Sequence, residues 1–194
     1  MNLSIQLQYN STKEWIDTVL NNFDEFLIDH ADCERKASGM AMGLVAKYPD
    51  RPEIIPELIE TAIEELEHFQ DVYKLMEKRG IKLPAAMQKD EYIVQLMACC
   101  RNGRDERFID KMLLGSVIEC RGAESFEMIY KNLEDEELKK FYHMLWASEA
   151  KHGNIFVKML FNYFDEKIIY ERLHELVAKE AEILKNLPIR PALH

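Results

Sequence analysis

One acidic pattern occurs twice in this chain of 194 residues, with almost the same internal spacing. Each copy is a single Glu followed about thirty residues later by the tetrapeptide Glu-x-x-His. The first copy consists of Glu34, Glu65 and His68, and the second consists of Glu119, Glu149 and His152. The gap between the two glutamates is 31 residues in the first copy and 30 in the second. Any fold of this chain must therefore explain two matched sets of carboxylates and imidazoles.

Helix geometry explains the pattern. Side chains three residues apart lie on the same face of a helix, so the Glu and the His of each tetrapeptide can reach one metal ion. A Glu from each of two helices, with Glu-x-x-His from each of two others, is the ligand set of ferritin-like proteins that hold two iron or two manganese ions. Oxygen-rich ligation with one imidazole per metal suits iron or manganese better than zinc or copper. We therefore predict that all six residues are metal ligands and form the catalytic site.

A third Glu-x-x-His runs from Glu171 to His174 but lacks the partner glutamate. The positions 31 and 30 residues before Glu171 are Lys140 and Phe141. We interpret this third copy as a coincidence on the exposed face of the last helix. The alternative for the other two copies, a set of ordinary surface glutamates, would place Glu34 and Glu119 among apolar neighbours by accident.

Turn residues divide the chain into helices. We expect four long helices, at about 24–47, 53–79, 106–131 and 136–163, separated by Pro49 to Pro52, by the segment after Gly80, and by Asn132 to Asp135. In each antiparallel pair the two glutamates lie about 15 residues from the turn, or about 22 Å at 1.5 Å per residue. The carboxylates therefore reach the same height in both hairpins. Residues 81–105 are long enough for a crossover between the hairpins.

These features predict an all-α fold, a ferritin-like four-helix bundle of two helix hairpins with a long crossover. A capping box from Ser11 to Glu14 predicts a short N-terminal helix, and Asp165 is a candidate cap for a C-terminal helix at about 166–187. No segment alternates with period 2 for long enough to predict a strand. We expect one domain over residues 1–194, with its core bundle at about 24–163.

Composition indicates a cytoplasmic protein. The four cysteines show neither zinc-type spacing nor a disulfide framework, which favours a reducing compartment. The chain has no signal-peptide pattern and no apolar run of 18 residues, so we expect no membrane span. The formal net charge is −10 and becomes −10 + 4 = −6 with two divalent cations bound. Basic residues form two clusters, which are Lys74, Lys78, Arg79 and Lys82 and, further on, Arg101, Arg104, Arg107 and Lys111.

The neighbours of the predicted ligands indicate a cavity beside the metals. Small residues surround the two single glutamates, among them Ala31, Ala37, Ser38, Ala41, Gly115, Ser116, Gly122 and Ala123. The other two helices supply bulk, with Phe69, Val72, Tyr142, Leu145, Trp146 and Phe156. Close helix packing is the alternative explanation for the glycines. His30, Arg35 and Arg121 are candidates for residues that orient the ligands, with solvent-facing positions as an equal alternative. We interpret Cys33 and Cys120 as small buried residues and not as ligands.

Four segments around the ligands resemble one family. They are Phe26-Leu27-Ile28-Asp29-His30-Ala31-Asp32-Cys33-Glu34-Arg35-Lys36-Ala37, Lys47-Tyr48-Pro49-Asp50-Arg51-Pro52, Glu64-Glu65-Leu66-Glu67-His68-Phe69 and Ala147-Ser148-Glu149-Ala150-Lys151-His152. They are similar to the MiaE family, the tRNA 2-methylthio-isopentenyladenosine hydroxylases. The similarity covers about residues 23–163.

The resemblance implies a non-haem di-iron monooxygenase that hydroxylates the isopentenyl group of this adenosine beside the tRNA anticodon. It implies two iron ions, with manganese as the second choice, bound by the six residues of the repeated pattern. It also implies dioxygen, tRNA and a ferredoxin-type electron donor as partners. The two basic clusters are then candidates for contacts with the tRNA backbone.

Other functions share the ligand set. They are another ferritin-like di-iron oxidase, a ferroxidase or iron-binding protein, and a dimanganese catalase, beside a helical scaffold without catalysis. Metal identity and substrate-dependent turnover would separate them. The sequence leaves the oligomeric state open.

Overall fold

A computed structural model describes residues 5–194, and every regular element in that range is a helix. The elements are α1 (Lys13–Asn21), α2 (Phe23–Lys47), the 3-10 helix η1 (Pro52–Ile54), α3 (Ile55–Lys78), α4 (Glu91–Ala98), α5 (Arg104–Asn132), α6 (Glu136–His152), α7 (Ile155–Leu160) and α8 (Glu166–Asn186). No helix within the described range is both long enough and apolar enough to cross a membrane. The predicted all-helical class is confirmed.

The described residues group into two compact units. One contains the N-terminal residues to Asp17, Lys89–Ile189 and His194, and the other contains Thr18–Gln88 and Arg190–Leu193. Each unit holds one of the two predicted hairpins and one copy of the acidic pattern. The single domain expected for residues 1–194 stays a prediction.

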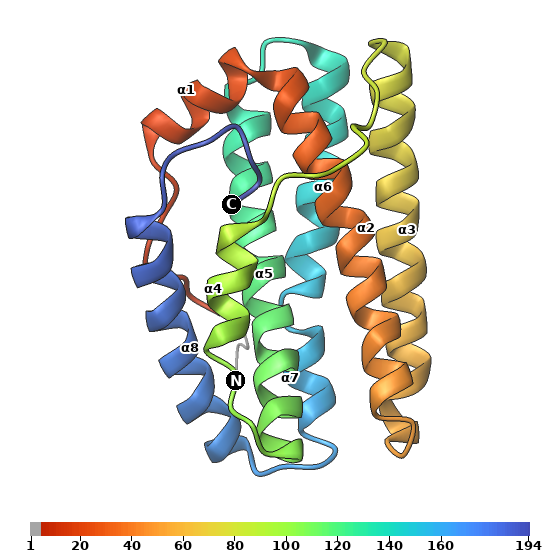
Figure 1. Ribbon diagram of the computed structural model, residues 1–194, viewed down its shortest axis with the longest axis vertical. Coiled ribbons are helices and arrows are strands. Elements are labelled where there is room, and N and C mark those ends of the chain that lie inside the picture. The colour runs from red at the N-terminus through yellow and green to blue at the C-terminus, as the bar shows by residue number, and fades with distance from the viewer. Residues whose placement is uncertain (1–4) are drawn as a thin grey trace. The chain divides into compact units, whose positions relative to one another are not determined.

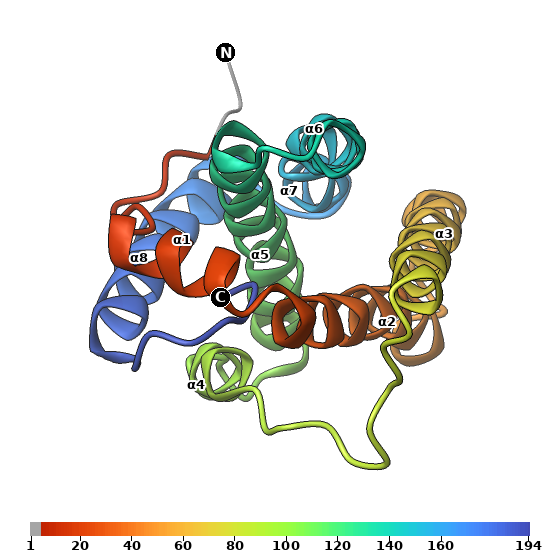
Figure 2. The same ribbon diagram turned by 90° about the horizontal axis from the view of Figure 1, so that it is seen from above.

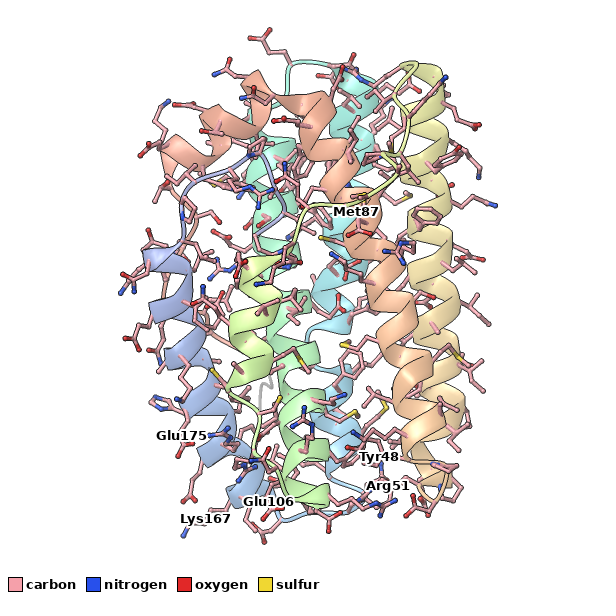
Figure 3. All side chains as sticks on the ribbon, in the orientation of Figure 1. Tyr48, Arg51, Met87, Glu106, Lys167 and Glu175 are labelled. Atoms are coloured by element: carbon pink, nitrogen blue, oxygen red, sulfur yellow. The ribbon has the colours of Figure 1, made fainter. Side chains whose placement is uncertain are left out.

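The α2–α3 hairpin forms the second unit (Figure 1). Its turn contains two buried side chains, Tyr48 and Arg51, which are labelled near the lower end of the hairpin in Figure 3. The Ser38 hydroxyl donates a hydrogen bond to the Ala62 carbonyl at 2.7 Å, which fixes the register of the two helices midway along the hairpin. Gly80 then ends α3 with a φ of 72°, a conformation that glycine adopts without steric cost.

Helix α5 is the centre of the other unit. In Figure 2, α6 and α7 lie on one side of it and α8 on the other. The Arg121 side chain is fully buried and joins α5 to α8 through Glu180, with Nε 2.8 Å from Oε1. The same guanidinium donates to the Tyr9 carbonyl at 2.6 Å, so it also holds the N-terminal segment.

A second buried ion pair fixes the start of α5. The Asp110 carboxylate is fully buried and accepts hydrogen bonds from Arg101 and Arg172 at 2.8 to 3.0 Å. Arg172 also donates to the Cys99 carbonyl at 2.9 Å, which fastens the end of α4 to α8. Burial alone would raise the pKa of Asp110, but the hydrogen bonds from the two arginines outweigh it, and the pKa lies below its ordinary value.

Most predicted helix boundaries are confirmed within a few residues, with two corrections. The helix expected at 136–163 is interrupted after His152, and the residues beyond the break form α7. The N-terminal helix is capped by Thr12, whose hydroxyl accepts a hydrogen bond from the Trp15 amide at 3.2 Å, and not by Ser11. Ser11 instead donates to Glu124 from its amide and its hydroxyl, so a long-range contact replaced the local cap. The Asp165 cap is confirmed.

We predict that Asp110→Asn lowers the free energy of unfolding at pH 7 by about 2 kcal/mol, because two arginines then face a neutral amide. The value lies below that of a fully buried pair because the Arg101 side chain is 38% exposed. The lowered pKa means that the stabilisation is complete above the unfolded value of about 3.9 and is lost as pH falls through the folded value. Urea unfolding at pH 7 and in a series below pH 4 measures both effects.

Asp17→Asn is the matched control, because Asp17 pairs only at the surface with Lys13. It should change stability little at any pH. Equal losses in the two variants, or a difference between wild type and Asp110→Asn that is unchanged by acid, would contradict the assignment.

Candidate metal centre

The α2–α3 hairpin brings together the first copy of the acidic pattern. The candidate ligand atoms of Glu34, Glu65 and His68 all lie within 4.8 Å of one another. Nδ1 of His68 is 3.4 Å from Oε2 of Glu65 and 3.8 Å from Oε2 of Glu34. Both glutamates are buried, at 4% and 1% exposed, and His68 is half-buried. This cluster has the size and the donor atoms for one metal ion, and we refer to it as the α2–α3 half-site.

The α5–α6 helix pair repeats this arrangement with the second copy. The candidate ligand atoms of Glu119, Glu149 and His152 also lie within 4.8 Å of one another. Nδ1 of His152 is 3.6 Å from Oε2 of Glu149. All three residues are buried, at 6%, 2% and 3% exposed. We refer to this cluster as the α5–α6 half-site.

His30 is the candidate orienting residue that contacts a predicted ligand. Its Nε2 lies 2.7 Å from Oε1 of Glu34, one helical turn further along α2, and its side chain is fully buried. The Phe26 ring lies 5.6 Å from the imidazole ring, between centroids, and packs against it. The sequence favours His30, Arg35 and Arg121 equally as orienting residues. In the structure, His30 contacts a predicted ligand, whereas the two arginines pair with other carboxylates.

The two arginines form ion pairs with carboxylates that are not predicted ligands. Arg35 is largely exposed and donates to Asp32 at 2.5 Å, whereas Arg121 is committed to Glu180 and Glu124. Burial would raise the pKa of Asp32, but hydrogen bonds from Lys36 and Arg35 lower it overall. These pairs stabilise the helices around the half-sites.

Helix α6 ends immediately after its ligand His152. A Cβ added to Gly153 would lie 2.6 Å from Sγ of Cys120, so any larger residue at this position would displace the Cys120 side chain or move α6 away from α5. The backbone groups released by the break are bonded by side chains of α5. The Cys120 thiol donates to the Gly153 carbonyl at 3.6 Å, and the Ser116 hydroxyl accepts from the Val157 amide at 3.3 Å. The expectation of one continuous helix was wrong because these contacts stabilise the interruption.

The cysteines next to the ligands are not suited to metal binding. Burial raises the pKa of the Cys120 thiol to about 11, so it stays protonated at neutral pH. The Cys33 thiol donates to Asp29 at 3.7 Å. Both cysteines are half-buried and not fully buried as expected. The proposed donor set remains one of oxygen and nitrogen.

The expected walls of a cavity are present only in part. Gly122, one turn after Glu119, is buried, and a Cβ added there would meet no atom within 4 Å. Close helix packing therefore does not explain this glycine. Tyr142 and Phe156 are fully buried, as expected for an aromatic wall. Ala123 and Trp146, in contrast, line a surface groove of about 640 Å³ together with the N-terminal segment.

The third Glu-x-x-His lies on the surface, as predicted. Glu171 and His174 are both exposed on α8, and Glu171 pairs with Lys167 at 3.9 Å. The two motifs that have a partner glutamate are buried, and the motif without one is not. Spacing to a second carboxylate was therefore the informative signal.

We predict that Gly153→Ala lowers the free energy of unfolding by about 1–3 kcal/mol, because the new methyl group overlaps Sγ of Cys120. Adding Cys120→Ala should remove much of this loss, so that the double variant is more stable than the sum of the single effects indicates. Gly122→Ala is the control, because its new methyl group enters open space and overlaps no neighbouring atom. It should not lose stability by steric overlap. Denaturant unfolding of wild type, Gly153→Ala, Cys120→Ala and the double variant gives the coupling, and additive effects would contradict the contact.

Comparison with known proteins shows similarity along nearly the whole chain. Residues 2–194 match the family described as tRNA-(MS2IO6A)-hydroxylase (MiaE). A tRNA 2-(methylsulfanyl)-N(6)-isopentenyladenosine(37) hydroxylase from Pseudomonas putida is 35% identical over 172 residues, which are 89% of this chain and 83% of that protein. The enzyme of the same name from Salmonella typhimurium is 32% identical over 100 residues, which are 52% of this chain and 36% of that protein.

A solved structure confirms the predicted ferritin-like fold class. It is a protein from Synechococcus described as having aldehyde deformylating oxygenase activity, with a TM-score of 0.92 and 31% sequence identity. The match covers 98% of this chain and 96% of the other. Since a family match extends over residues 2–194 and includes both copies of the acidic pattern, the chain belongs to the MiaE family of tRNA hydroxylases.

Proposed function

We propose that the α2–α3 and α5–α6 half-sites bind two metal ions in one dinuclear centre. The ligands would be Glu34, Glu65 and His68 with Glu119, Glu149 and His152. The observation that carries this proposal is that each half-site independently gathers two carboxylates and one imidazole within 4.8 Å. Four carboxylates also balance the charge of two divalent cations, which offsets the cost of burying them.

Iron is the metal that we propose, with manganese as the alternative. Hard oxygen donors with one imidazole per metal suit both ions. Three protein ligands per half-site leave coordination positions open. Two iron ions bound there would supply the activation of dioxygen needed to place oxygen in an unreactive C–H bond. The role of the chain is to hold the ions at fixed separation, keep water away through the buried helix faces, and present the substrate.

The substrate that we propose is tRNA carrying 2-methylthio-isopentenyladenosine, and the product carries a hydroxyl on the isopentenyl group. The names of the Pseudomonas and Salmonella relatives describe this substrate. Buried small and aromatic residues near the half-sites, such as Gly122 and Tyr142, would suit an apolar five-carbon tail. Dioxygen and a ferredoxin-type electron donor would complete the reaction, and a cytoplasmic location stays a prediction.

The two basic clusters differ in how well they would serve the tRNA backbone. In the first, Lys74 pairs with Asp71 and Arg79 pairs with Asp24, both at exposed positions. Exposed pairs are worth about 1 kcal/mol or less, so a phosphate can replace them. In the second, Arg101 is held by the buried Asp110 and is poorly suited to RNA binding.

The Synechococcus protein favours a second candidate, oxidation of an aldehyde. Its similarity over 98% of this chain shows that the same helical framework accompanies that activity in another protein. An aldehyde is therefore tested as a second substrate beside the prenylated tRNA.

We predict that protein loaded with ferrous iron adds one oxygen atom to prenylated, methylthiolated adenosine in tRNA when reductant and air are supplied. Nucleoside mass spectrometry measures a gain of about 16 mass units, the mass of one oxygen atom, because hydroxylation replaces C–H by C–OH. Omitting iron should abolish the gain. Consumption of a long-chain aldehyde with no change in tRNA would instead select the second candidate, and rapid iron oxidation without either product would indicate iron handling.

We also predict that Glu119→Ala and His152→Ala each lose one of the two bound metal ions and remain folded, because each removes a ligand from a single half-site. Glu171→Ala and His174→Ala are matched controls, since they alter the exposed third motif. Iron content by elemental analysis and helicity by circular dichroism give the result. A full metal complement in the first pair of variants would disprove the ligand assignment.

A further inference from the structure

The carboxylate of Glu34 contacts a different group through each of its oxygens. Oε1 lies 2.7 Å from Nε2 of His30, and Oε2 lies 3.8 Å from Nδ1 of the predicted ligand His68. An ionised carboxylate only accepts hydrogen bonds, so His30 donates through Nε2. The hydrogen bond occupies Oε1 and leaves Oε2 directed to the half-site.

The imidazole of His30 is itself held in place. It is fully buried on α2, and the Phe26 ring packs against it with a centroid separation of 5.6 Å. On the other side of Glu34, the Ser38 hydroxyl bonds to the Ala62 carbonyl and fixes α2 against α3. Contacts one turn before and one turn after Glu34 therefore restrict the backbone and the side chain of this ligand.

The α5–α6 half-site has different residues at the two corresponding positions. Alignment of Glu119 with Glu34 places Gly115 at the position of His30 and Ala123 at the position of Ser38. Neither residue has a polar side chain. Gly122 leaves additional space one turn after Glu119, because a Cβ there would meet no atom within 4 Å. The two half-sites thus share their ligands and differ in what surrounds the single glutamate.

We propose that His30 is a positioning residue that restricts Glu34 to binding metal through Oε2. This inference rests on the dinuclear centre proposed above. A carboxylate held by this hydrogen bond would offer the metal ion the same oxygen atom throughout. Replacing a residue that hydrogen-bonds to a metal ligand commonly changes the metal affinity by about 10- to 100-fold.

The test is titration of the metal-free protein with Co(II), followed by visible absorption and calorimetry. Wild type should bind two ions. His30→Leu should weaken one binding step about 10- to 100-fold and leave the other nearly unchanged. His30→Gln should restore most of the loss, because its amide can donate to Glu34. His143→Leu is the matched control, since His143 is exposed on α6 and packs on Tyr130 and Trp146.

Circular dichroism and thermal unfolding establish that each variant is folded. If His30→Leu is unfolded, His30→Asn replaces it in the titration. The Asn side chain is shorter than that of Gln, so its amide does not reach the Glu34 carboxylate. Unchanged Co(II) affinities in the folded Leu or Asn variant would overturn the proposal. So would a Gln variant as weak as the Leu variant, because His30 would then act as a ligand or a packing residue. Fewer than two ions on wild type would instead overturn the dinuclear centre itself.

Discussion

Burying a carboxylate away from water costs several kcal/mol unless an opposite charge and hydrogen bonds compensate for it. Seven acidic residues among residues 5–194 are buried, and they fall into two groups. Asp32, Asp110 and Glu180 are each paired with Lys or Arg, Asp32 within α2 and the other two between segments of the chain. The four glutamates of the repeated pattern are accompanied by histidines instead. Bound cations would compensate the second group, as we propose, and the ion pairs of the first group stabilise the helices that carry those glutamates.

Local periodicity made the clustering of the six glutamate and histidine side chains predictable from the sequence. Glu and His three residues apart must share a helix face, and equal distances from a turn must bring two glutamates level, whatever the other side chains are. The break after His152 was missed, although Gly153-Asn154 is a recognisable interruption signal. Arg121 could not be assigned, because its partner Glu180 lies 59 residues away and on another helix. His30 was recognisable as a neighbour of Glu34, but only the 2.7 Å contact distinguishes it from Arg35.

The two halves of the chain repeat a ligand pattern without repeating its surroundings. On α2 the residues around the single glutamate are polar and engaged, whereas on α5 they are small. An internal repeat can thus keep its six predicted ligands while the residues around the two copies differ. In this family member, the difference lies in side chains one turn from the ligands, which a comparison of ligands alone would not reveal.

The end of α6 at His152 has an electrostatic consequence. The carbonyl groups at the C-terminus of a helix carry a partial negative charge equivalent to about half an electron. His152 is the last residue of α6, whereas α3 continues for ten residues beyond His68, to Lys78. A cation bound by His152 therefore lies at the negative end of a helix dipole, and one bound by His68 lies beside the middle of a helix. The interruption imposed by Gly153 thus makes the two imidazoles electrostatically different.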